Sequence, residues 1–144
     1  MADLYEQDFY TWALTQADFL RTRSGNRLDW DRLAEELQSL GASEERELGS
    51  RLEVLISHLL KWIYQPERRS RSWENTIRAQ RQSLAKHLRR NPGLKSIEAA
   101  EFLDAYETAR LAASSETDLD VAVFPPTPPF SLEQARDPAW WPPG

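Results

Sequence analysis

Apolar positions recur at helical spacing along most of this chain. Between the Gly and Pro residues they return every third or fourth position rather than every second one, which is typical of amphipathic α-helices and not of strands. The pattern predicts five helices, over about residues 3–23, 29–40, 43–65, 70–90 and 92–115. The expected fold class is therefore all-α, a single-domain bundle of about five helices.

Residues with known end preferences mark several of these boundaries. Asp29 is a natural N-cap for the second helix, and Gly41 stands at the position where a left-handed residue would end it. Ser43 can cap the third helix, whose apolar face is the widest and is expected to form the centre of the core. Asn91, followed by Pro92, is expected to cap the fifth helix.

The last 24 residues have a different character. Paired prolines in "VAVFPPTPPF" favour extended backbone, while Ser131 and Gln134 can cap one short helix. The segment is also rich in Val, Phe and Trp, so we expect a Pro/Trp-rich strap packed on the helices. This divides the chain into a helical bundle over 1–120 and the strap over 121–144. The alternative is that the strap binds a groove on another protein.

Composition excludes several classes of protein. The chain has no Cys, which excludes disulfides and thiolate chemistry. Six Trp in 144 residues are typical of a folded domain rather than a disordered one. No apolar stretch is long enough to span a membrane, and the N-terminus does not resemble a secretory signal, so we expect a cytoplasmic protein without a membrane partner.

Positive charge is concentrated in one part of an acidic chain. Residues 61–90 hold nine Lys or Arg and two Asp or Glu, although the whole chain has a formal charge of −5. A helical wheel of the fourth helix places several arginines away from its apolar stripe, and two more precede that helix. This candidate anion or partner surface comprises Arg68, Arg69, Arg71, Arg78, Arg81 and Arg89.

Three interpretations of the basic surface stay open. Acidic runs in the neighbouring helices could pair with the arginines, which would cancel the surface electrostatically. The arginines could bind the phosphates of RNA or DNA through the segment Arg68–Arg90. They could also bind a protein partner. Trp62 and Trp73 flank the loop before the fourth helix and are expected to pack in the core rather than to stack on bases.

Candidate catalytic chemistry is sparse. His58 and His87 are the only histidines, and no nucleophile with a paired base is visible, so no catalytic residue, cofactor or metal site is predicted. The strongest polar cluster is a helix junction with His58, Lys61 and Gln65, where an acid/base site would need a nearby carboxylate. The carboxylates considered for that role are Glu35, Glu36, Glu45 and Glu47.

Four segments together resemble a known bacterial family, the domain of unknown function twenty-nine. They are "DLYEQDFYTWALTQADFLR", "LDWDRLAEELQSLG", "SRLEVLISHLLKWIYQPERRSRSWENTIRAQRQSL" and "FPPTPPFSLEQARDPAWWP". The resemblance implies an all-helical single domain and supplies no activity. The residues that match its signature are His58, Lys61, Trp62, Gln65, Arg69, Ser72, Trp73, Ile77 and Arg81.

We therefore expect a non-enzymatic interaction module that binds a protein partner. RNA or DNA binding through the basic segment is the alternative, and an enzyme built around His58 comes third. A homo-oligomer stays open.

Overall fold

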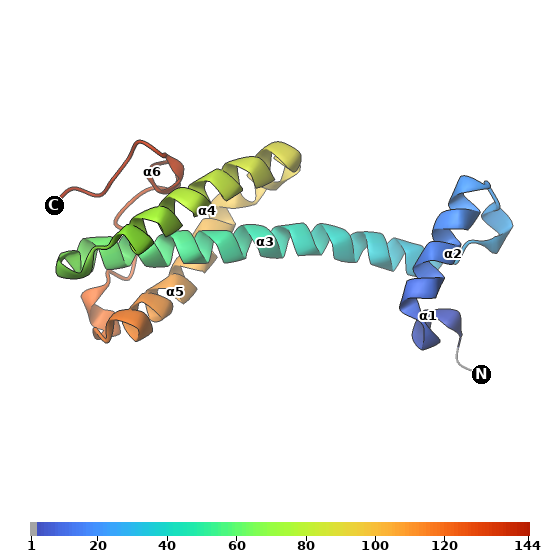
Figure 1. Cartoon of the computed structure of the whole chain (residues 1–144), viewed down its shortest axis with the longest axis horizontal. Coiled ribbons are helices and arrows are strands. Elements are labelled where there is room, and N and C mark those ends of the chain that lie inside the picture. The colour runs from blue at the N-terminus through green and yellow to red at the C-terminus, as the bar shows by residue number, and fades with distance from the viewer. Residues whose placement is uncertain (1–2) are drawn as a thin grey trace. The chain divides into compact units, whose positions relative to one another are not determined.

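The computed structural model describes residues 3–144, and every regular element in this range is helical (Figure 1). The all-α fold class predicted from the apolar pattern is confirmed. The α-helices are α1 (Leu4–Gln7), α2 (Phe9–Arg21), α3 (Trp30–Tyr64), α4 (Arg71–Arg90), α5 (Glu98–Thr117) and α6 (Leu132–Arg136). Short 3-10 turns are η1 (Gly25–Arg27), η2 (Pro66–Arg68), η3 (Pro92–Ser96) and η4 (Val121–Val123).

Contacts within the chain divide it into two compact units, Met1–Ala42 and Ser43–Gly144. This division differs from the boundary at residue 120 that the sequence suggests, and each unit is described here by itself. None of the helices described over residues 3–144 is long and apolar enough to cross a membrane.

The first unit is a helical hairpin with a small interior. Instead of one helix over 3–23, the chain forms α1 and α2, because Asp8 leaves the helical conformation and its carboxylate accepts a hydrogen bond from the Thr11 amide at 3.0 Å. Among the residues described in this unit, only Trp12 and Gln16 are buried. The Gln16 side chain accepts a hydrogen bond from the Asp29 amide at 2.8 Å, which ties the two arms of the hairpin together.

The expectation that Gly41 ends a helix is wrong. Residues 29–40 and 43–65 belong to one helix, α3, which runs for 35 residues without a break. Gly41 does not adopt a positive φ, and apart from the adjacent residues and the backbone of the helix itself no atom lies within 4 Å of the position that a Cβ would take there. A Gly inside a helix costs about 1 kcal/mol relative to Ala, which the hydrogen bonds of the flanking turns outweigh.

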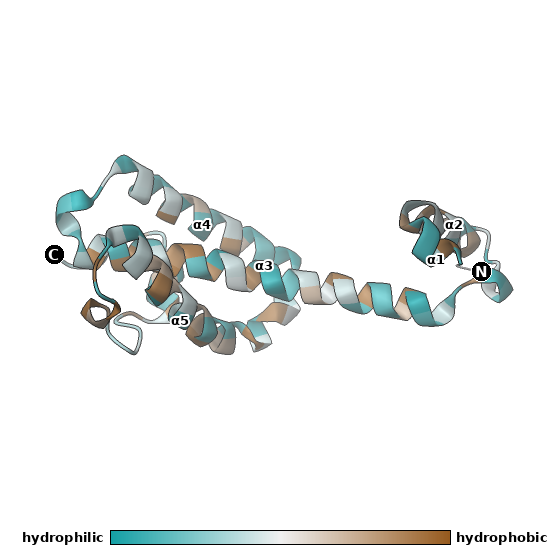
Figure 2. Ribbon diagram, turned by 90° about the horizontal axis from the view of Figure 1, so that it is seen from below, coloured by the Kyte–Doolittle hydropathy of each residue, from teal (hydrophilic) through white to brown (hydrophobic). Residues whose placement is uncertain are grey.

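The second unit is built around the C-terminal half of α3. Figure 1 shows α4 and α5 lying along this half, and Figure 2 shows apolar and polar positions alternating along the helix. Most leucines and isoleucines in the C-terminal half of α3 and in α4 are fully buried, while α5 contributes several small residues that let its backbone approach closely. The core consists of Leu48, Leu52, Leu55, Ile56, Leu59, Leu60, Ile77, Leu84, Leu88, Phe102, Ala105, Tyr106, Ala109, Ala113, Phe124, Phe130 and Ala135.

Asn91 does not cap the fifth helix as expected. It is followed by the turn η3, and α5 begins only at Glu98, after Ile97. The Asn91 side chain instead donates hydrogen bonds to the His87 carbonyl and to Glu44 at 3.1 Å each. The Asn91 side chain therefore bonds to Glu44 of α3 instead of capping the fifth helix as the local sequence pattern predicts.

The C-terminal segment packs on this second unit as a strap. Phe124 and Phe130 are buried in the core, and Trp141 lies 4.9 Å from Trp62 between ring centres. The predicted short helix is present as α6, with Ser131 and Gln134 forming a reciprocal capping box.

Candidate functional site

Arg81 does not belong to an exposed basic surface. Only 4% of the residue is exposed, and its guanidinium points into the strap rather than toward solvent. Its Nε donates to the Ala135 carbonyl at 2.8 Å and one Nη donates to the Gln134 carbonyl at 3.4 Å. Burial lowers the pKa of Arg81, since it disfavours the charged form. The expectation that this arginine faces away from the interior is wrong, and the residue holds the strap on α4.

Two further arginines of the predicted surface also contact the strap. Arg69 donates to the Trp62 carbonyl at 2.8 Å and to the Gly144 carbonyl at 2.7 Å, and its guanidinium lies over the Trp62 ring. Arg78 lies over the Trp141 ring, 5.3 Å from its centre, and pairs with Glu74 one turn earlier on α4. These two arginines therefore contact aromatic rings and main-chain carbonyls more than they pair with the acidic residues of neighbouring helices.

The rest of the predicted surface faces solvent. Arg68, Arg71 and Arg89 are exposed, and none of the ion pairs formed among residues 3–144 includes them. Three separated arginines make a much weaker polyanion surface than the six that the sequence suggests, because each phosphate contact adds to the affinity separately.

The structure brings His58 and Lys61 together with a carboxylate that the sequence did not identify. Lys61 is buried, and its Nζ lies 2.6 Å from Glu116 of α5 and 3.4 Å from Nε2 of His58. Two of the acidic residues considered for this role lie elsewhere: Glu47 contacts His87, and Glu36 accepts a hydrogen bond from Tyr5. A carboxylate on α5 is 55 residues away from Lys61 in sequence, so no local spacing reveals it.

His58 is held in one tautomer. Its Nδ1 lies 2.8 Å from the Val54 carbonyl, which can only accept, so Nδ1 carries the hydrogen and Nε2 accepts from Lys61. Burial lowers the pKa of His58, and the positive charge of Lys61 adds to this effect. The hollow beside the ring measures about 130 Å³, below the range of about 300–1,000 Å³ that small-molecule sites usually occupy. The cluster therefore joins α3 to α5 and has little room for a substrate.

Gln65 and Trp73 complete this junction. Gln65 donates to the Thr117 carbonyl at 3.5 Å, a long contact at the end of α5. Trp73 is half-buried, and the Lys61 ammonium lies 5.2 Å from its ring centre. Trp73 therefore lies at this junction and outside the core cluster, with one ring face contacted by Lys61.

A different surface stands out in the first unit. An apolar groove of about 300 Å³ runs between α2 and the first turns of α3, and its lining is almost entirely apolar. Phe9 is 50% exposed, Leu37 67% and Leu40 64%, although core positions of a helix are normally covered. The groove is lined by Phe9, Trp12, Ala13, Gln16, Ala17, Leu20, Leu33, Glu36, Leu37 and Leu40.

The sequence did not reveal this groove because its leucines repeat at the spacing of a core stripe. Leu33, Leu37 and Leu40 form the apolar stripe of residues 29–40, one of the segments that the sequence assigns to a five-helix bundle. A stripe at i, i+4 and i+7 predicts that a helix face is apolar, but not whether the chain itself covers that face.

Comparison with known proteins gives one match. The family model described as "Domain of unknown function DUF29" matches residues 4–141, nearly the whole chain. The chain belongs to this family. No curated protein and no solved structure matches it. The family supplies no activity, so the functional argument rests on this chain's own residues.

Proposed function

We propose that this protein is a non-enzymatic interaction module whose apolar groove binds a helix of a protein partner. The observation that carries the proposal is the exposure of Phe9, Leu37 and Leu40 along one concave surface. Helix-in-groove recognition uses this kind of surface, with apolar anchors of the bound helix at i, i+3, i+4 and i+7.

The small interior of the first unit supports a binding role. A segment of about 40 residues usually needs a further partner, metal or disulfide to fold stably. Here the buried apolar residues described between positions 3 and 42 reduce to Trp12, and the chain has no Cys. A bound helix would supply the apolar contacts that this hairpin lacks.

Charge favours a partner other than a second copy of the chain. Residues 1–42 contain four Arg and no Lys against eight Asp or Glu, and Glu36 lies in the groove lining. Two such units would bring like charges together, whereas a helix flanked by Lys or Arg would complement them. The expected partner segment is therefore an amphipathic helix with an apolar face of Leu, Ile, Phe or Met and basic flanks.

A designed peptide tests this proposal. A Leu/Lys peptide of about 18 residues with Leu at helical spacing is titrated into the full chain by calorimetry, beside a peptide of equal composition without the stripe. We expect binding of the striped peptide alone. The double substitution Leu37→Glu with Leu40→Glu should weaken it at least about tenfold, because each buried Leu contributes roughly 1.5–3 kcal/mol.

The matched control is Leu103→Glu with Leu111→Glu, two α5 leucines of similar exposure at 58% and 61%. It should leave binding unchanged. Equal binding of both peptides, or an equal loss in both double variants, would overturn the proposal. Light scattering then separates the remaining alternative: a dimer that dissociates when Leu37 and Leu40 are changed would make the groove a self-interface instead.

RNA or DNA binding is less well supported. Of the six arginines that suggested it, Arg69, Arg78 and Arg81 contact the strap, which leaves Arg68, Arg71 and Arg89 for phosphates. Fluorescence anisotropy with labelled RNA and DNA across a salt series would show this activity, and tight binding at about 100 mM salt would favour it over the groove.

A further inference from the structure

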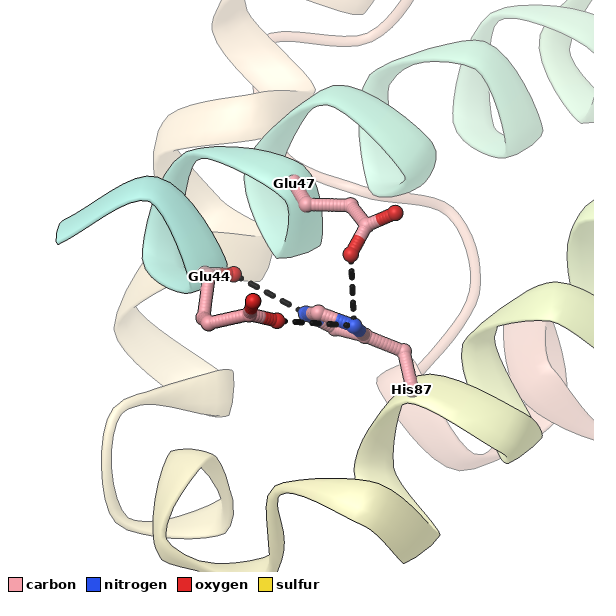
Figure 3. Close-up of side chains that lie close together, drawn as sticks. All are labelled: Glu44, Glu47 and His87. Carbon is pink, nitrogen blue, oxygen red and sulfur yellow. Dashed lines mark hydrogen bonds and ion pairs between the residues drawn. The ribbon is translucent and has the colours of Figure 1, made fainter. Parts of the chain in front are cut away.

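A buried histidine of the second unit faces two carboxylates. Figure 3 shows the His87 side chain reaching from α4 to lie between Glu44 and Glu47, which project from successive turns of α3. Nδ1 of His87 lies 2.7 Å from an oxygen of Glu47 and 3.5 Å from one of Glu44. Only 7% of His87 is exposed. None of these residues takes part in the apolar groove.

The hydrogen bond of Nε2, the other ring nitrogen of His87, determines whether Nδ1 carries a hydrogen or a free lone pair. Nε2 of His87 lies 2.9 Å from the main-chain carbonyl of Glu44, which accepts hydrogen bonds and cannot donate one. Nε2 therefore carries the hydrogen. In the neutral ring this leaves a bare lone pair on Nδ1, directed at two carboxylate oxygens that are themselves only acceptors. Three electron-rich atoms in this arrangement repel one another unless a cation lies between them.

That cation is either a proton on Nδ1 or a metal ion, for which the cluster offers three donor atoms. The three donor atoms lie within 4.8 Å of one another. Ligands about 2.1 Å from a tetrahedral ion stand about 3.4 Å apart. The 3.5 Å distance from Nδ1 to Glu44 matches this spacing, whereas the 2.7 Å distance to Glu47 is that of a hydrogen bond and would lengthen by about 0.7 Å around an ion. A histidine whose remote nitrogen donates to a main-chain carbonyl is also the usual outer-shell arrangement of a metal-bound imidazole.

Neighbouring side chains orient both carboxylates. Arg51 donates to Oε1 of Glu47 at 3.0 Å, which leaves Oε2 directed at His87. Asn91 donates to Oε2 of Glu44 at 3.1 Å. These contacts hold the donor atoms in place before an ion arrives, and Arg51 balances part of their negative charge.

The cluster is open on one side. A cavity of about 500 Å³ borders Glu47 and His87 and is also lined by Arg51, Lys86 and Arg90. It gives an ion a route to the donor atoms and leaves room for water or an anion at the positions that three protein ligands leave open.

We propose that Glu44, Glu47 and His87 form a binding site for a divalent first-row transition metal ion. One imidazole nitrogen with two carboxylate oxygens suits Zn²⁺, Mn²⁺ or Fe²⁺, whereas Mg²⁺ and Ca²⁺ prefer oxygen ligands throughout and Cu⁺ prefers sulfur. Zn²⁺ is the test ion, because it binds such sites more tightly than Mn²⁺ or Fe²⁺. No local spacing in the sequence reveals this site, since its ligands lie on two helices about 40 residues apart.

Calorimetry of the full chain, freed of metal with a chelator, tests the site. We expect Zn²⁺ to bind with one ion per chain and to release protons as it binds. Glu47→Gln should weaken binding at least about tenfold and His87→Gln about a hundredfold or more, since each removes a ligand. His58→Gln removes the other histidine and should leave the affinity unchanged.

Co²⁺ gives a second readout that does not depend on the stability of a variant. A bound Co²⁺ ion with a nitrogen ligand should produce visible absorption bands that Zn²⁺ abolishes by competition, and Glu47→Gln should lose them even if His87→Gln does not fold. No binding to the unaltered chain at about 1 mM Zn²⁺ would overturn the proposal and assign the gap to a proton. Unchanged affinity in Glu47→Gln and His87→Gln would overturn it as well.

Discussion

Replacing Arg81 by Gln tests how the basic helix is used. Arg81 is the only one of the predicted surface arginines that is buried among the described residues, and its Nε hydrogen bond to the Ala135 carbonyl is buried as well. Gln is shorter and uncharged, so Arg81→Gln should break this link between α4 and the strap and leave the Ala135 carbonyl without its donor.

The expected loss follows from three contributions. A hydrogen bond from a charged donor contributes about 1.5–3 kcal/mol. The guanidinium also lies 5.4 Å from the centre of the Trp141 ring, a contact worth about 0.5–1 kcal/mol. The other Nη of Arg81 has no hydrogen-bond partner, so removing this buried charge offsets the loss of stability by roughly 1 kcal/mol. We therefore expect Arg81→Gln to lower the free energy of unfolding by about 2 kcal/mol.

Urea denaturation followed by circular dichroism measures this loss, with Arg89→Gln as the matched control. Arg89 is exposed on the same helix, so its replacement should change the free energy of unfolding by no more than about 0.5 kcal/mol. Limited proteolysis should also cut the strap near Thr127 faster in Arg81→Gln. Equal stability of the two variants, with equal proteolysis, would show that Arg81 does not hold the strap.

Three further predictions concern the helices and buried polar groups. Gly41→Ala should raise the free energy of unfolding by about 0.5–1 kcal/mol, because Gly41 lies inside α3 with open space around its Cα; a loss of stability in the same urea titration would show instead that the helix ends there. Burial raises the pKa of Tyr106 to about 12, so the unfolded chain loses this proton first and stability should fall as pH rises from about 10 to 12. Tyr106→Phe should reduce that fall and cost about 1 kcal/mol at neutral pH through the lost hydrogen bond to the Pro125 carbonyl, which urea titrations at several pH values would detect; an unchanged pH profile would contradict the assignment. Lys61→Met should raise the pKa of His58, because the Lys61 charge opposes protonation of the ring, and an NMR titration of the imidazole protons that shows no rise would place Lys61 away from it.

The fold class could be predicted because it depends on a periodic signal within each segment. Apolar residues at helical spacing indicate helices wherever they occur, and local caps such as Ser131 with Gln134 act within one turn. Gly41 shows where such local signals fail. Its preference for a left-handed conformation is a statistical tendency, and the continuous hydrogen bonding of α3 outweighs it.

The candidate sites depend on contacts between distant segments. A helical wheel assigned Arg81 to the basic face of α4, but whether that position is solvent or interior depends on the strap, 54 residues later. The carboxylate that pairs with Lys61 and the pair that faces His87 were likewise hidden, because each is supplied by another helix.

The sequence by itself therefore determined that this protein is helical, which faces of its helices are apolar and where its positive charge is concentrated. These properties follow from neighbours within a few residues of one another. Only the tertiary structure decided that the strap contacts three of the basic residues, Arg69, Arg78 and Arg81. It also decided that Leu37 and Leu40 stay exposed. The convergence of Glu44, Glu47 and His87 is likewise a property of the tertiary structure. The physical reason is that the surroundings of a side chain depend on which distant segment packs against its helix, and helical periodicity carries no information about that choice.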